Sequence, residues 1–148
     1  MAMHRIRHWA TRGFHTFLEQ RARRPFAWGV NDCALFAADG IRAITGVDIA
    51  ADFRGKYSDE AGAMAAVKEV AGGSTVADAA AYCAAKHGLI EWTHPLMARR
   101  GDLVVARQPD GSLISGLVHL GGRHVVTVGA RGLVRLPISS VVRSWHYE

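Results

Sequence analysis

The sequence has few cysteines, little lysine and no long apolar run. Its two cysteines, Cys33 and Cys83, lie far apart, and each falls within a helical apolar pattern, so we expect no disulfide framework. No stretch approaches the ~20 apolar residues of a membrane span. The first 25 residues hold six arginines where an export signal needs an apolar stretch. We therefore expect a soluble chain without a Sec-type signal.

The positive charge comes almost wholly from arginine, which outnumbers lysine fifteen to three in a chain of net charge +5. Such a surface suits nucleic acid, an acidic protein or an anionic cell-wall polymer. The sequence has no zinc-finger spacing, no aromatic RNA-binding strand and no basic region that runs into heptads. We therefore expect no nucleic-acid partner and interpret most of the arginines as solvated surface.

The N-terminal segment from His4 to about Arg23 is predicted to be a helix, because Trp9, Phe17 and other apolar residues recur at three- and four-residue steps. His4, His8 and His15 would share a face, but no carboxylate or cysteine joins them at a suitable spacing, so no metal site is expected. We interpret residues 1–24 as a basic amphipathic docking helix and residues 25–148 as one α+β domain.

A second helix is predicted after Pro25, with Asn31 or Asp32 as its N-cap and Gly46 as its C-cap. Its apolar stripe is Cys33, Phe36, Ala37, Gly40, Ile41 and Ile44. A third helix is expected from Ser58 to about Ala71. A fourth follows a capping box at residues 75–78 and reaches about His87, with Cys83 in its buried stripe.

The pattern changes to strands after Gly101, at residues 102–106, 113–120, 124–128 and 133–136. Pro109-Asp110-Gly111 predicts a turn, and Gly121-Gly122 predicts a two-residue hairpin turn. Helices followed by strands indicate an α+β fold with a small antiparallel sheet.

Cys33 is the candidate nucleophile. A thiol at a helix N-terminus lies beside unpaired backbone N–H groups and the positive end of the helix dipole, which lowers its pKa and favours the reactive thiolate. The alternative is that Cys33 only packs in the core, as most cysteines on an apolar stripe do.

Short motifs resemble the NlpC-type cell-wall peptidases of the papain-like fold, in which a Cys begins a helix and a Gly-Asp-Leu-Val segment begins the sheet. The matching segments here are Trp28 to Cys33 and Arg100 to Val104. An uncharacterised branch encoded in phage and prophage tail gene clusters is more similar still. That resemblance covers Pro25 to Tyr147 and rests on Phe26-Ala27-Trp28-Gly29, Asp32-Cys33, Arg54-Gly55-Lys56-Tyr57, Gly72-Gly73, Gly101-Asp102, Leu136-Pro137 and Trp145.

The resemblance implies hydrolysis of peptidoglycan peptide bonds by Cys33, with a histidine base at the start of the second strand. Ser115 stands at that position, and a serine hydroxyl is no general base near neutral pH. His119 and His124 are expected to be cross-strand partners on the same face, but His119 lies roughly 13 Å along the strand from Ser115. His94, in a loop, is a weaker substitute.

Three further residues are candidates for substrate binding: Trp28, Asp32 and Ser115. Their structural alternatives are a core plug for Trp28 and a helix cap for Asp32. Asp102 is expected to fix the turn into the sheet. No cofactor is expected.

The resemblance, with Ser115 at the base position, implies a phage tail-tip or tail-assembly component with a degenerate catalytic dyad, in the virion or in the host cytoplasm before assembly. Other tail proteins are then its partners, and peptidoglycan is a further one. The alternative is an active cysteine peptidase or amidase that opens peptidoglycan during phage entry. A third is a bacterial protein, unrelated to phage, that uses this fold for acyl transfer.

Overall fold

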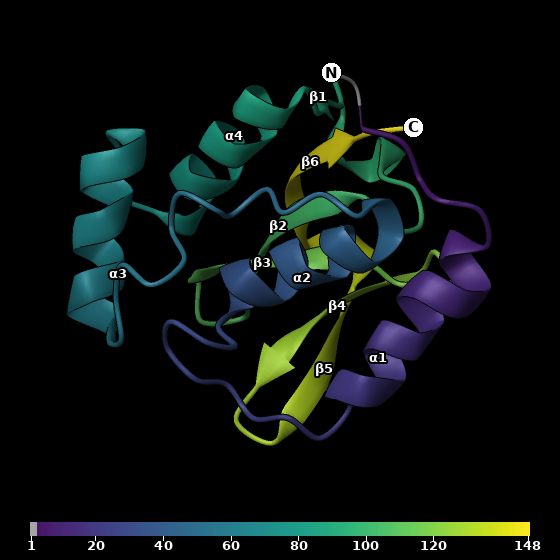
Figure 1. Cartoon of the computed structure of the whole chain (residues 1–148), viewed down its shortest axis with the longest axis horizontal. Coiled ribbons are helices and arrows are strands. Elements are labelled where there is room, and N and C mark those ends of the chain that lie inside the picture. The colour runs from purple at the N-terminus through teal and green to yellow at the C-terminus, as the bar shows by residue number, and fades with distance from the viewer. Residues whose placement is uncertain (1–2) are drawn as a thin grey trace.

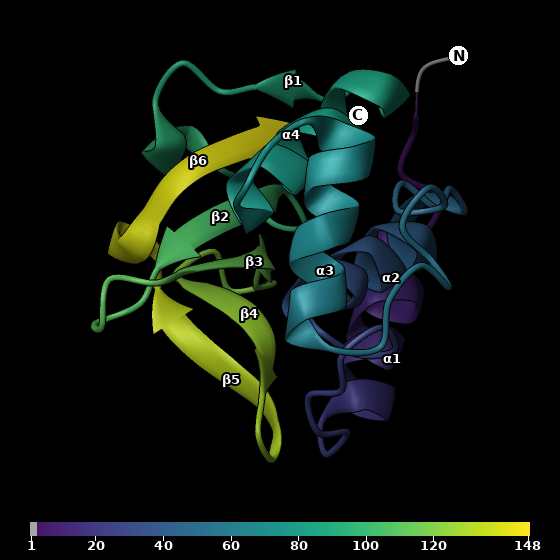
Figure 2. The same cartoon turned by 90° about the vertical axis from the view of Figure 1, so that its left-hand side faces the viewer.

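The computed structural model describes residues 3–148 as helices packed on one face of a curved antiparallel sheet (Figures 1 and 2). The helices are α1 (His15–Arg21), α2 (Cys33–Thr45), α3 (Glu60–Ala66) and α4 (Val76–His87). One π-helical turn, Trp9–Phe14, leads into α1 and another, Val67–Ala71, extends α3. Within the described residues no helix is both long and apolar enough to cross a membrane.

The sheet has six strands in the order β1-β6-β2-β3-β4-β5, and every neighbouring pair is antiparallel. Their bounds are Ile90–Glu91, Leu103–Arg107, Leu113–Val118, His124–Gly129, Gly132–Pro137 and Val141–His146, for β1 to β6. The predicted α+β class and four of these strands are confirmed. We did not predict β1 or β6, and β6 lies inside the sheet between β1 and β2.

Helix α2 forms as the sequence predicts and is the central element of the core (Figure 1). Asp32 caps its start, and Gly46 ends it in the left-handed conformation at φ 82°. Gly40 lets α2 approach the sheet closely, because a Cβ there would lie 2.3 Å from the Leu117 side chain. Phe36 is fully buried and packs on Phe17, with 5.2 Å between ring centroids.

The other predicted elements differ in detail. The third helix is capped by Asp59 rather than Ser58, and the capping box of α4 is present at Thr75 and Asp78. The Pro109 turn forms, with Gly111 N–H donating to the Gln108 carbonyl at 2.9 Å. The hairpin turn at Gly121-Gly122 is shifted by one residue, because Gly122 N–H bonds back to the His119 carbonyl.

The N-terminal segment departs from our prediction in two ways. Its helical part begins at Trp9 rather than His4, because the preceding residues pair with distant backbone, including an Ile6 N–H bond to the Ile44 carbonyl at 2.8 Å. Its apolar stripe is also not free to dock on a partner, since Phe14, Phe17 and Leu18 are buried in the core of the chain itself. Residues 3–148 therefore form one body, and docking by the charged face stays a prediction.

An ion pair ties this segment to the sheet. Arg5 donates to the Asp102 carboxylate at 2.8 Å, and the two side chains are 12% and 0% exposed. The Arg5 guanidinium also lies over the rings of Trp9 and Tyr147. Asp102 accepts two more bonds, from the Trp92 indole and from Arg99 N–H, so it does fix the turn that enters β2. Burial nevertheless raises the pKa of Asp102.

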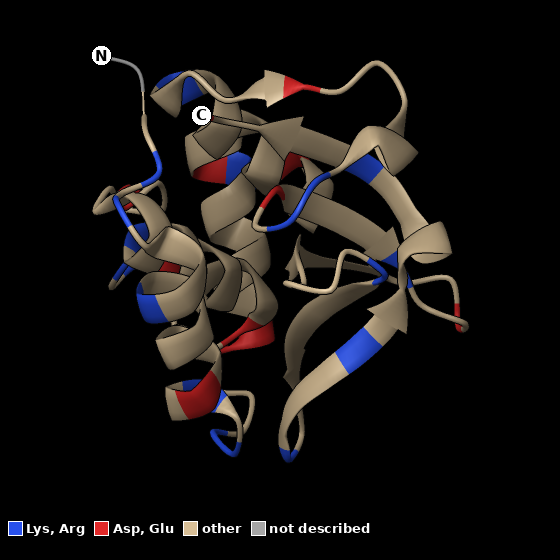
Figure 3. Ribbon diagram, turned by 90° about the vertical axis from the view of Figure 1, so that its right-hand side faces the viewer, with Lys and Arg blue, Asp and Glu red and all other residues tan. Residues whose placement is uncertain are grey.

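Lys and Arg do not gather on one element. On the side drawn in Figure 3, they are distributed over the N-terminal segment, helices, loops and strands, and are interrupted by acidic positions. The arrangement is that of a solvated basic surface, without a continuous basic helix or strand.

Arg5→Leu tests the contribution of the buried pair. We expect a loss of about 3 kcal/mol in the free energy of unfolding, because the substitution removes the close ion pair of the buried Asp102 carboxylate and leaves only Arg99, at 4.0 Å. Denaturant unfolding measures this. Arg7→Leu is the matched control, since Arg7 is an exposed arginine of the same segment. Equal losses in the two variants would contradict the role assigned to the pair.

Candidate functional site

The start of α2 is held by the Asp32 carboxylate, which is only 2% exposed. One oxygen accepts Leu35 N–H at 2.9 Å, as an N-cap does. The other oxygen accepts Gly29 N–H at 3.0 Å and the Tyr57 hydroxyl at 2.6 Å. Asp32 therefore joins the loop before the helix, the helix itself and the segment before α3. This cap was predicted, but the bond from Tyr57 was not.

Gly29 makes the close packing of these segments possible. Its φ is +78°, and a Cβ added there would lie 2.1 Å from the Tyr57 carbonyl oxygen. Glycine is therefore favoured for two reasons: the backbone is left-handed, and there is no space for a side chain. The Trp28-Gly29 and Tyr57 motifs, which are separate in the sequence, meet at this contact.

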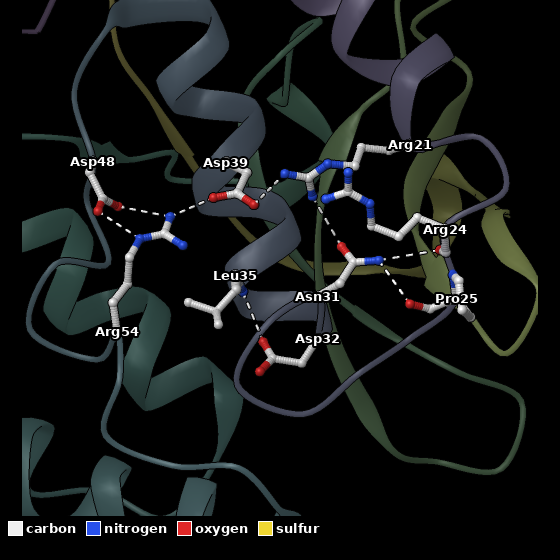
Figure 4. A network of polar contacts seen from close by, with 9 residues as sticks. All are labelled: Arg21, Arg24, Pro25, Asn31, Asp32, Leu35, Asp39, Asp48 and Arg54. Carbon is white, nitrogen blue, oxygen red and sulfur yellow. Dashed lines mark hydrogen bonds and ion pairs between the residues drawn. The ribbon is translucent and has the colours of Figure 1, made fainter.

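Asn31 anchors the same loop from the opposite side (Figure 4). Its side-chain amide donates to the carbonyls of Arg24 and Pro25, and its oxygen accepts from Arg21 at 3.1 Å. Arg21 in turn pairs with Asp39 of α2 at 2.7 Å. The loop before α2 is therefore tied both to the end of α1 and, through Arg21, to α2 itself.

The chain of charges continues beyond α2. Asp39 also pairs with Arg54, and Arg54 pairs with Asp48 at 2.7 Å (Figure 4). Alternating charges thus connect α1, α2 and the loop that follows α2. Sequence analysis named Arg54 only as part of a motif and did not name Asp39, because no local pattern indicates that the two side chains pair between α2 and the loop that follows it.

A cavity of about 410 Å³ opens beside the start of α2. Its walls come from α2, α3, α4, the loop at residues 49–57 and the strands β2 and β3. Cys33, Asp32, Trp28 and Ser115 all line it, so the structure brings four of the six predicted site residues to one place. This volume lies in the range of small-molecule sites.

Cys33 does not have the lowered pKa that we expected. Burial raises the pKa of its thiol to about 11, and the Asp32 charge adds to the rise. Hydrogen bonds from the backbone N–H groups of Ser115, Ala34 and Cys33 itself lower the pKa of the thiol, but by less than burial raises it. The helix terminus favours an anion, but removing the sulfur from water costs more.

Ser115 occupies the cavity wall but offers no base. It is 2% exposed, and its hydroxyl donates to the Val104 carbonyl at 3.4 Å. Thr127 donates to the Ser115 carbonyl at 2.8 Å from β4. The backbone of Ser115 is close enough to the sulfur to influence the pKa of Cys33.

His119 and His124 lie at the far end of the β3-β4 hairpin. They are paired as predicted, with His119 N–H donating to the His124 carbonyl at 2.8 Å. His119 is half-buried, and burial followed by the charge of Arg135 lowers its pKa. His94 caps a short turn by accepting Leu96 N–H at 3.1 Å. No histidine is among the described residues that line the cavity.

Trp28 stands at the cavity mouth rather than in the core. It is 37% exposed and packs edge-on against Phe26, with 4.8 Å between ring centroids. Cys83 is buried on α4, as predicted, and burial raises its pKa to about 12. Within residues 3–148, no three His, Cys, Asp or Glu side chains gather in a way that would hold a metal ion.

Gly29→Ala tests the packing that positions Asp32 and Cys33. We expect it to lower the free energy of unfolding by about 3 kcal/mol, because the new methyl group meets backbone atoms as well as an unfavourable φ. Gly55→Ala is the matched control, since Gly55 has φ +75° but open space at its Cβ. It should cost only about 1 kcal/mol. Similar losses for both variants in denaturant unfolding would refute the steric part of this explanation.

Comparison with known proteins gives a family. The family described as Domain of unknown function (DUF6950) matches residues 4–147, which include the N-terminal helix as well as the cavity. Neither the curated proteins nor the solved structures include a match to the chain. Since the match spans nearly the whole sequence, the chain belongs to the DUF6950 family.

Proposed function

We propose that this protein is a phage tail-tip or tail-assembly component that keeps an NlpC-like, papain-like fold as a module without hydrolytic activity. The observation that carries the proposal is the composition of the cavity at Cys33. A thiol lies at a helix N-terminus as in a cysteine peptidase, and the described lining contains Ser115, at the position that the resemblance assigns to the base, but no histidine.

The protonation state of the thiol supports an inactive site. A nucleophilic cysteine needs a base or a positive charge to hold its thiolate near neutral pH. The charge of the Asp32 carboxylate has the wrong sign and adds to the effect of burial, which raises the thiol pKa to about 11. At about pH 7 nearly every molecule would therefore carry a protonated sulfur.

The assignment to phage tails rests on the resemblance, and the geometry supports treating its motifs as one set. Gly29, Asp32 and Tyr57 come from three separate motifs, and all three meet at the Asp32 carboxylate. Motifs that fix the position of one helix start are expected to occur together even where the chemistry is lost.

An active cysteine peptidase or amidase is the second candidate. One observation favours it, namely that the sulfur lines an accessible cavity with Trp28 at its mouth instead of being sealed in the core. Such an enzyme would need a general base from a residue that does not line the cavity in this structure.

Alkylation of Cys33 against pH, combined with a digestion assay, separates the two candidates. The proposal predicts that the alkylation rate still rises above about pH 9, because the thiol pKa is about 11. Cys33→Ala supplies the background from Cys83. The proposal also predicts that neither wild type nor Cys33→Ala releases fragments from purified sacculi. A rate plateau below about pH 8 together with fragment release by wild type alone would establish the enzyme instead.

Ser115→His tests whether only the base is missing. An imidazole at this position would hold the thiolate as an ion pair and raise the alkylation rate at about pH 7 by about tenfold or more. Ser112→His is the matched control, because Ser112 also lines the cavity but is exposed. A folded Ser115→His protein that reacts no faster than this control would mean that Ser115 is not at the base position.

A further inference from the structure

The cavity beside Cys33 exists because small side chains face it. Helices α2, α3 and α4 contribute methyl groups where longer aliphatic side chains would close the space: Ala34, Ala38, Ala63, Ala79 and Ala80. The remaining wall is largely hydrocarbon, from residues such as Ile49, Phe53 and Leu103. An apolar cavity of this size is costly to leave unfilled, because its walls lack contact partners.

The lining divides into a buried interior and an exposed rim. Ala38, Phe53 and Leu103 are at most 6% exposed, whereas Met64 is 53% exposed and Trp28 is 37% exposed. Glu60, Ser74, Thr75 and Ser112 are exposed as well, so polar groups are concentrated where the cavity meets solvent. An occupant would therefore enter with its apolar end first.

In the described part of the chain, the interior offers no side-chain oxygen or nitrogen that waits for a polar ligand, and its backbone donors are the N–H groups that face the Cys33 sulfur. Both oxygens of Asp32 already accept hydrogen bonds, and the Ser115 hydroxyl is bonded to the Val104 carbonyl. Within residues 3–148, no buried side-chain nitrogen or oxygen lacks a partner. A peptide group placed inside, away from the backbone N–H groups at Cys33, would lose its bonds to water without replacement, at a cost of about 1–3 kcal/mol for each group.

The charges of the lining also exclude a muropeptide. Peptidoglycan stem peptides carry several carboxylates, which need Arg, Lys or backbone donors. Among the described residues that line the cavity there is no Lys, Arg or His, and the two carboxylates present are Asp32 and Glu60. Like charge and the absence of a basic side chain from the described lining both oppose such a ligand.

We infer that this cavity binds one unbranched aliphatic chain, such as a fatty alcohol or a lipid tail, with its polar end among the hydroxyl groups of the rim. An aliphatic chain is thus the ligand class of the proposed non-hydrolytic module. The inference rests on that proposal in one respect, because it treats the cavity as a site that binds its ligand without hydrolysing it.

Displacement of a fluorescent probe tests the inference. Wild-type protein is loaded with N-phenylnaphthylamine, an uncharged apolar dye, and dodecanol is then titrated. We expect saturable dye binding at one site for each chain, displacement by dodecanol, and no displacement by a purified muropeptide. Vesicles of phosphatidylcholine form a separate arm. Because the dye itself partitions into bilayers, this arm is scored by the phosphatidylcholine that stays with the protein after the vesicles are removed. Retained lipid indicates a membrane lipid tail as the source, and dodecanol binding without retained lipid indicates a free chain.

Two variants on α3 locate the site. Ala63 lines the cavity, whereas Ala65 is exposed on the same helix and does not. Ala63→Trp should fill the space and weaken dodecanol binding by about tenfold or more, while Ala65→Trp should leave it unchanged. If Ala63→Trp does not fold, Met64→Glu places a charge at the exposed rim and should weaken binding in the same way.

Three results would overturn the inference: no dodecanol binding by wild type, equal binding by the Ala63→Trp and Ala65→Trp variants, or displacement of the dye by the muropeptide. Failure of the proposed function is measured separately, by fragment release from sacculi that depends on Cys33. If the protein binds dodecanol and also digests sacculi, the inference about the ligand stands and the proposal of an inactive module fails.

Discussion

The position of the Asp32 carboxylate is the constraint on which the site depends. It accepts hydrogen bonds from the helix, from the loop before the helix and from Tyr57, and so it fixes where α2 begins. Cys33 is the next residue, and its sulfur is thereby held at the cavity. The same carboxylate raises the pKa of the thiol that it positions. The group that builds the site thus also makes the thiol less reactive.

Burial has opposite consequences for packing and for chemistry in this protein. Close approach of α2 to the sheet, allowed by Gly40, packs the core, and burial at the start of the helix raises the pKa of the Cys33 thiol. In a cysteine peptidase a base offsets the cost of desolvating the thiolate. No such group lines this cavity within the described residues, so the gain in packing leaves a neutral thiol. Beside this thiol lies a cavity with a largely apolar lining.

Features set by local sequence could be predicted. The start and end of α2, its buried stripe from Phe36 to Ile44, the capping box of α4 and the turn at Pro109 depend on neighbouring residues, and all are present. Cys33, the first residue of the predicted stripe, is only half-buried. Strand β6 was missed because its Val-Val-Arg-Ser-Trp-His sequence does not alternate cleanly. Its irregular pairing with β2, with a bulge after Val105, also cannot be inferred from composition.

Features that join distant segments could not be predicted. Tyr57 lies 25 residues from Asp32, and Arg5 lies 97 residues from Asp102. The residues next to Tyr57 and Arg5 in the sequence do not indicate which distant side chain each one contacts. The expectation for Cys33 was wrong for a related reason. The helix terminus is visible in the sequence, whereas the desolvation that outweighs it arises from packing against β3 and the neighbouring helices.

An inactive site requires that the thiol of Cys33 stays protonated near neutral pH in the folded protein. The most direct measurement is the carbon chemical shift of the Cys33 Cβ in isotope-labelled protein, followed across a pH titration. The structure predicts one transition near the raised pKa of about 11 and no change around neutrality. A transition below about pH 8 would show a stabilised thiolate and would contradict the assignment of this protein as a module without hydrolytic activity.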